Sequence, residues 1–102
     1  MKVVKIKHKW DNTVHCYYYC PGCKYDHAFN PSVHQWNEDR EKPTVTPSLL
    51  NSNPQNYHTC HSYIKDGQIQ FLSDCWHDLK GQTVSLVDID VSHFDLEHVE
   101  II

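Results

Sequence analysis

Residues 17–24 read Tyr-Tyr-Tyr-Cys-Pro-Gly-Cys-Lys, and we expect the chain to fold around the knuckle Cys20-Pro21-Gly22-Cys23 within them. Two thiolates on either side of a tight Pro-Gly turn can bind one soft metal ion together, and a closed site then needs two more ligands. Suitable residue types follow much later, in Cys60-His61 and Asp74-Cys75-Trp76-His77. The pattern therefore predicts a metal site closed over a long range.

The segments on both sides of the knuckle have strand patterns. Residues 14–20 alternate, with Cys16, Tyr18 and Cys20 on one face, and residues 25–29 can return as a second strand of a zinc-ribbon-like hairpin. Residues 3–9 alternate apolar and basic side chains at their centre, which is typical of a half-buried strand. A redox Cys-x-x-Cys motif needs a helix that begins at its first cysteine, so these strands favour metal binding.

A second hairpin is predicted where Asp66-Gly67 joins residues 60–65 to residues 68–72, because this dipeptide suits a type I′ turn. A two-residue loop places Ile64 opposite Ile69 and Cys60 opposite Ser73. If the pairing continues to the open end of the hairpin, Cys60 and Cys75 lie on one face as diagonal neighbours.

From this parity we predict a closed metal site of four thiolates, with a structural role because no coordination position is left for a substrate. The predicted ligands are Cys20, Cys23, Cys60 and Cys75. Zn²⁺ is the expected ion, although the same ligands also suit iron. A mixed site in which His61 or His77 replaces one or both late cysteines remains open, and Cys16 is expected to be a buried thiol.

If the four cysteines bind the metal, the nearby histidines and Asp74 are free to form a second cluster. It consists of His27, His61, Asp74 and His77. Such a group can bind a small anionic ligand or a second metal, or can perform acid–base chemistry. No residue is assigned a catalytic role at this point, and a binding function is favoured over an enzymatic one.

The fold class expected from length and pattern is a mainly β, small single domain of residues 1–102, with a zinc-ribbon-like knuckle and antiparallel hairpins. Residues 43–50 carry two prolines and are expected to be extended, at a sheet edge or in a fixed loop. Residues 83–91 are expected to form a last strand, and residues 92–102 to add another short one. Residues 32–42 fit either a helical turn or a polar loop.

Charge and cysteine content restrict the class of function. The net charge is −4 and the pI is about 6.1, which disfavours generic nucleic-acid binding. Five cysteines in a chain that opens without an export signal are typical of a reducing cytoplasm, and no apolar run is long enough to span a membrane. The acidic end of the chain suits either a basic partner or a solvated face.

Four blocks of the sequence resemble a group of small phage and prophage proteins that often carry the label "ammonia monooxygenase". The blocks are CPGCKYDHAFN (residues 20–30), WN and PTVTPSLL (within residues 36–50), CHSYIKDGQIQFL (residues 60–72) and DCWHDLKGQTV (residues 74–84). The resemblance implies a phage-encoded zinc-binding protein in the host cytoplasm, without an established activity. Its recurring positions match Cys20, Cys23, His27, Cys60, His61, Asp74, Cys75 and His77.

The sequence thus predicts an accessory protein with a structural zinc that binds a host or defence protein, or a small ligand. Two alternatives remain open. One is a zinc-dependent hydrolase with an open coordination position at the metal. The other is a structural protein that acts as an oligomer.

Overall fold

The computed structural model describes residues 1–53, 55–56 and 58–102, and these residues form strands, turns and loops without a helix. The strands are β1 (Val3–His8), β2 (Val14–Cys20), β3 (Tyr25–Phe29), β4 (Gln35–Trp36), β5 (Val45–Asn53), β6 (His58–Lys65), β7 (Gln68–Phe71), β8 (Thr83–Ser85) and β9 (Val99–Ile101). The prediction of a mainly β fold is confirmed. None of the described residues belongs to a helix that could cross a membrane.

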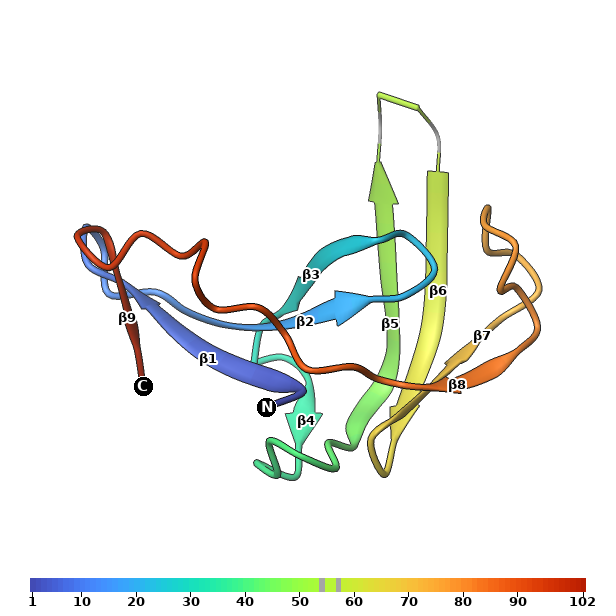
Figure 1. Cartoon of the computed structure of the whole chain (residues 1–102), viewed down its shortest axis with the longest axis horizontal. Helices are drawn as coiled ribbons and strands as arrows, with labels where there is room; N and C mark the ends of the chain where they lie inside the picture. The colour runs from blue at the N-terminus through green and yellow to red at the C-terminus, as the bar shows by residue number, and fades with distance from the viewer. Residues whose placement is uncertain (54, 57) are drawn as a thin grey trace.

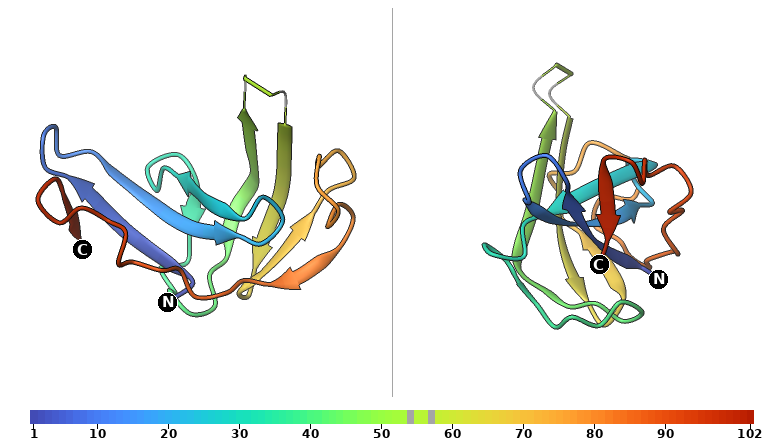
Figure 2. Two further views of the ribbon diagram at one scale, coloured as in Figure 1. Left: turned by 45° about the horizontal axis from the view of Figure 1, so that its top comes forward. Right: turned by 90° about the vertical axis from the view of Figure 1, so that its left-hand side faces the viewer.

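The strands form two antiparallel sheets (Figure 1). One sheet has the order β3-β2-β1-β9 and contains both strands next to the knuckle. The other has the order β4-β5-β6-β7-β8 and contains the second hairpin. In the right-hand view of Figure 2 the first sheet lies in front of the second, and in both views the end of the β5–β6 pair extends beyond the first sheet.

The second hairpin has the predicted turn and register over its first half. Asp66 and Gly67 both have positive φ, 51° and 79°, as a type I′ turn requires. Ile64 lies opposite Ile69 as expected, but the β6–β7 ladder ends at Ser62 and Phe71. Beyond that point the segment after β7 makes only single backbone hydrogen bonds to β6, such as the one from the Leu72 N–H to the His61 carbonyl, and the predicted Cys60–Ser73 pair is not part of the ladder. On the other side of β6, Cys60 lies opposite Asn51 of β5.

Other segments differ from the prediction mainly in length. Gln35 and Trp36 form a short strand against β5, within the segment for which a helical turn or a loop was expected. The strand predicted over residues 83–91 covers only Thr83–Ser85, because the chain then leaves the sheet and passes the amino terminus, where the Ile89 N–H donates to the Met1 carbonyl. The acidic tail does add a strand, β9, which pairs with β1.

A bulge interrupts β5 where it passes β6. Val45 lies opposite Ile64, and the next paired residue, Leu49, lies opposite Ser62. Three residues of β5 therefore face a single residue of β6, so the chain between Val45 and Leu49 bends out of the ladder. Ser48 is the last residue of this bulge.

The main hydrophobic core lies between the two sheets and includes all five cysteines. Its buried members are Val3, Cys16, Tyr18, Cys20, Cys23, Phe29, Val45, Leu49, Cys60, Ile64, Ile69, Phe71, Cys75 and Leu86. Cys16 is fully buried there, in the small-hydrophobe role expected for it. Because Cys20 and Cys60 come from different sheets, the cysteines lie where the two layers meet.

Candidate active site and metal cluster

Three polar side chains form a continuous hydrogen-bonded chain on the outer face of the second sheet. The Nε2 atom of His61 lies 3.0 Å from Ser48 Oγ, and its Nδ1 atom lies 3.2 Å from Asp74 Oδ2. The His61 side chain is 27% exposed and the Asp74 side chain 56% exposed, so the group is open to solvent on one side. An imidazole is thus held between a hydroxyl and a carboxylate.

Each of the three residues comes from a different part of the chain. His61 is on β6, with its side chain on the face opposite to that of buried Cys60 and Ser62. The bulge in β5 places Ser48 beside it. The ladder resumes at Leu49, and Leu50 lies directly opposite His61. Asp74 lies in the segment after β7, which returns along β6.

This arrangement can activate a nucleophile. A serine hydroxyl is a weak nucleophile unless a neighbouring base removes its proton, and a histidine can do so when a third group orients its ring. The two distances lie within or at the limit of the hydrogen-bond range that such groups need. His61 and Asp74 were predicted as site residues, whereas Ser48 was not, because a single serine between a proline and a leucine has no pattern of its own.

A buried metal-ligand cluster lies on the opposite face of the same strand. Four ligand atoms lie within 4.8 Å of one another, and they belong to Cys20, Cys23, His27 and Cys60. The sulfurs of Cys20 and Cys60 are 3.9 Å apart. With Zn–S bonds of about 2.3 Å, the edge of a tetrahedron is about 3.8 Å, so this distance is that of two ligands on one ion.

His27 has the free nitrogen that a fourth ligand requires. Its Nε2 atom is buried and has no hydrogen-bond partner among the described residues. A buried ring nitrogen without a partner is costly, and a metal ion would satisfy it. Around the knuckle, the Cys23 N–H donates to Cys20 Sγ over 3.4 Å, and Trp76 Nε1–H donates to Cys23 Sγ over 3.3 Å. Such donors stabilise negative sulfur.

The ionisation of the cysteines follows the same geometry. The hydrogen bond between the Cys20 and Cys60 sulfurs holds the pKa of Cys20 well below its usual range, despite burial. The same bond, together with burial, raises the pKa of Cys60. A cation bound between the two sulfurs would displace the proton of their hydrogen bond.

Cys75 and His77 form a second group with Cys60, also within 4.8 Å. The His77 ring lies so close to Gly22 that a Cβ atom there would be 2.2 Å from His77 Cε1. The Leu79 N–H donates to His77 Nδ1 over 3.2 Å, so the neutral ring carries its proton on Nε2. That nitrogen is 3.5 Å from Cys60 Sγ and is placed to donate to the sulfur.

Cys75 makes two hydrogen bonds with the backbone of His61. The His61 N–H donates to Cys75 Sγ over 3.2 Å, and the Cys75 S–H donates to the His61 carbonyl over 3.1 Å. Since Cys60 precedes His61 and Asp74 precedes Cys75, each pair of neighbours has one member in the hydrogen-bonded chain and one among the buried cysteines. The position of the His61 imidazole therefore depends on Cys60 and Cys75, which lie on the buried face of the sheet.

The structure divides the predicted ligand-binding cluster between the two faces of the sheet. His61 and Asp74 are together on the outer face, whereas His27 and His77 are buried beside the cysteines. The choice of Cys75 as the fourth metal ligand stays a prediction. The free nitrogen of His27 and the backbone contacts of Cys75 favour His27 in that place.

The metal content of two variants is expected to identify the fourth ligand. His27→Ala should weaken metal binding by at least about 100-fold, since losing a ligand costs at least as much as losing an outer partner. Cys75→Ala should keep the metal at wild-type stoichiometry. X-ray absorption should then report three sulfur ligands and one nitrogen ligand, whereas four sulfurs would restore Cys75 to the site.

Comparison with known proteins gives one match. A family model with the description "Bacterial ubiquitination-like system serine protease (BubE)" matches residues 2–72. The matched range includes Ser48 and His61 as well as Cys20, Cys23 and Cys60, and it ends before Asp74. Neither the curated proteins nor the solved structures contain a match.

Proposed function

The chain belongs to the BubE family of bacterial ubiquitination-like system serine proteases, and on this premise we propose that it is a serine peptidase. Ser48 is the nucleophile, His61 the general base, and Asp74 the carboxylate that orients the imidazole. The observation that carries the proposal is the continuous hydrogen-bonded chain from Ser48 Oγ through both nitrogens of His61 to Asp74.

In the proposed reaction, Ser48 Oγ attacks the carbonyl carbon of the scissile bond while its proton passes to His61 Nε2. The tetrahedral intermediate collapses to an acyl-enzyme, and His61 gives the proton to the departing amine. A water molecule, deprotonated by the same nitrogen, then releases the acid product and restores Ser48. Asp74 remains ionised and stabilises the imidazolium that forms in each half of the reaction.

The substrate of this reaction is a polypeptide. The family description supports a protein of a ubiquitination-like system in that role. The partner binding expected from the sequence then becomes the recognition of a protein substrate. The phage origin implied by the resemblance stays a prediction, and no step of the reaction depends on it.

Zinc is the ion proposed for the buried cluster, where it has a structural role. Its proposed ligands are Cys20, Cys23, His27 and Cys60. Four protein ligands leave no position for water or substrate, so the ion takes no part in the chemistry. Its contribution is to hold β6 against the β2–β3 hairpin, and thereby to keep His61 in place.

Replacing Asp74 with asparagine is expected to lower kcat/KM for peptide hydrolysis by about 10²- to 10⁴-fold, because the imidazole loses the carboxylate that fixes its tautomer. The lower part of this range is expected, since Asp74 is half exposed and water can partly take its place. The measurement uses purified, metal-loaded protein, a random mixture of unfolded peptides, and mass spectrometry of the products.

Asp78→Asn is the matched control, because Asp78 is an exposed aspartate of the same segment that makes no side-chain contact with His61. Its activity should equal that of the wild type. Equal activity of Asp74→Asn and Asp78→Asn would contradict the role of Asp74, and a folded protein that cleaves no peptide would contradict the proposed function.

A further inference from the structure

The projecting end of the β5–β6 pair has two edges that differ in their backbone partners. The edge of β6 is covered by the segment after β7: the Leu72 N–H donates to the His61 carbonyl, and the Trp76 N–H to the Thr59 carbonyl, each over 2.9 Å. On the edge of β5, β4 pairs only with Val45 and Thr46. From residue 49 to residue 53, no described residue pairs with the backbone of β5 on that side.

This open edge begins at the nucleophile. Ser48 ends the bulge, and residues 49–53 continue from it as regular strand. The carbonyl of Ser48 lies 3.3 Å from His34 Nε2. His34 belongs to the segment before β4, and this segment covers the edge of β5 no further than Ser48. In Figure 1 the same part of β5 extends upward beyond β4.

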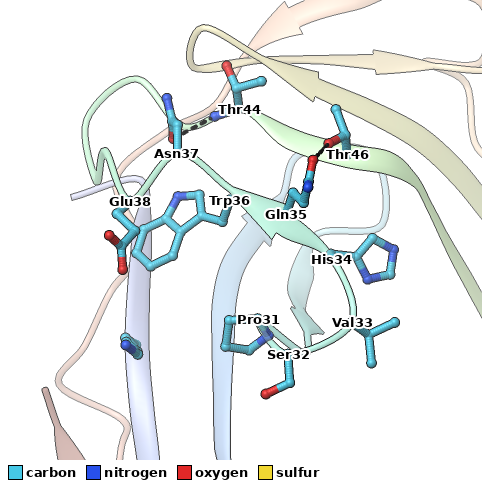
Figure 3. Close-up of a pocket in the computed structure, with 11 residues that line it drawn as sticks. Pro31, Ser32, Val33, His34, Gln35, Trp36, Asn37, Glu38, Thr44 and Thr46 are labelled. Atoms are coloured by element: carbon cyan, nitrogen blue, oxygen red, sulfur yellow. Dashed lines mark hydrogen bonds between the residues drawn. The ribbon is translucent and has the colours of Figure 1, made fainter.

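A cavity lies at each end of the open edge. The first has a volume of ≈ 600 Å³ and is lined by the segment around β4, with Trp36 and Pro31 in its wall and Thr46 of β5 at its border. Figure 3 shows these side chains and the hydrogen bond from Thr46 to Gln35. The second cavity, of ≈ 260 Å³, is lined by Asn51, Ser52 and Asn53 of β5 together with Tyr25 and His27.

We propose that the substrate binds as an extended peptide segment that adds a strand to the open edge of β5, between these two cavities, and so brings its scissile carbonyl to Ser48. This inference rests on the proposed function, since it takes Ser48 as the nucleophile. An unpaired strand edge offers a row of backbone donors and acceptors that any extended chain can use. Five residues of such a strand span about 17 Å.

Binding at the open edge of β5 restricts the class of substrate. Only a chain that is locally unfolded can pair along residues 49–53, so the site takes flexible tails or linkers and rejects bonds inside helices or sheets. Affinity comes from the peptide backbone, and alternate side chains of the substrate point toward the sheet face that carries His61 and exposed Leu50. Sequence preference is expected to be weak except next to the first cavity.

The test is a scan of backbone N-methylation. A decapeptide that the wild-type protein cleaves is selected from a random library, and each amide is methylated in turn. Every second methyl group within about five residues of the scissile bond is expected to lower kcat/KM about tenfold, because strand pairing uses alternate amides. Methyl groups at the positions between should have little effect.

Two controls separate this inference from the proposed function. Hydrolysis that persists in Ser48→Ala overturns the proposed function, whatever the methylation pattern. Ser48-dependent hydrolysis without a two-residue period overturns the edge proposal alone. In Ser48→Ala protein saturated with the peptide, alternate amides of residues 49–53 should show slower hydrogen exchange, and protection located elsewhere would also overturn the edge proposal.

Discussion

Replacing Ser48 with alanine is expected to lower kcat/KM for peptide hydrolysis by about 10⁴-fold or more, because the variant has no hydroxyl that can form the acyl-enzyme. Stability and metal content should stay at wild-type values. Ser48 is only half buried, its Oγ faces the outer surface of the sheet, and the metal cluster lies on the other side. Rates, thermal unfolding and metal analysis are measured on the same preparation.

Ser85→Ala is the matched control for this variant. Ser85 is an exposed serine on β8, two strands away from β6, and takes no part in the contacts of His61. Its hydrolysis rate should be that of the wild type. A Ser48→Ala protein that still cleaves peptides at a rate within tenfold of the wild type would remove Ser48 from the mechanism. A metal-hydroxide hydrolase would behave in that way.

Replacing Cys20 with serine is expected to leave the protein largely unfolded. Cys20 ends β2 in one sheet and Cys60 lies on β6 in the other, so an ion bound by both holds the two layers together. In small structural zinc sites the apparent binding free energy is about 10 kcal/mol or more, and it contributes to folding. Since the whole stability of a small domain is about 5–15 kcal/mol, losing this term should abolish the folded state.

Circular dichroism and the thermal midpoint, measured with and without a chelator, check this expectation. Cys16→Ala is the control, since Cys16 is buried on the same strand but lies outside the metal cluster. It should retain the metal and lose only about 1–2 kcal/mol of stability through the small cavity. A Cys20→Ser protein with a native spectrum and an unchanged midpoint would show that the metal does not stabilise the fold.

The link between the two sites explains why metal loss should also abolish hydrolysis. Cys60 and His61 are consecutive on β6, and Cys75 contacts both backbone polar groups of His61. Release of the cysteines would therefore move the imidazole relative to Ser48. Activity depends on the metal because the metal keeps His61 in position. Chelation alone would abolish activity in the same way as the loss of a catalytic zinc.

Local signals made most of the strands predictable. The alternation of residues 14–20 and the Asp66-Gly67 turn depend on neighbours in the chain, and both β2 and the Ile64–Ile69 register agree with them. The predicted hairpin was too long, because the β6–β7 ladder ends at Ser62 and Phe71. The pairing of Cys60 with Asn51 of β5 joins distant segments, and no local pattern predicts it. Even so, Cys60 and Cys75 do lie close together, as members of one group.

The nucleophile could not be predicted in the same way. Ser48 becomes distinctive only when the bulge in β5 places it across from His61, and that placement needs the register of β5 on β6. Pro43 and Pro47, which precede it, predicted an extended segment at a sheet edge or in a fixed loop. The segment is extended, but Val45 and Thr46 lie between β4 and β6, and the pattern carries no chemistry. His61 and Asp74 were predicted to be neighbours because the alternation of the hairpin places both on the face opposite that of Cys60, and they are in contact.

The most direct test of the serine mechanism is covalent labelling with a fluorophosphonate, followed by mass spectrometry of the digested protein. The oxygen of an activated serine displaces fluoride from such a reagent and becomes phosphonylated, whereas a serine without a neighbouring base reacts far more slowly. One adduct per chain is expected, on the peptide that contains Ser48, with no adduct in Ser48→Ala. A folded, metal-loaded protein that stays unlabelled, or that carries its adduct on another residue, would contradict the assignment of Ser48 as the nucleophile.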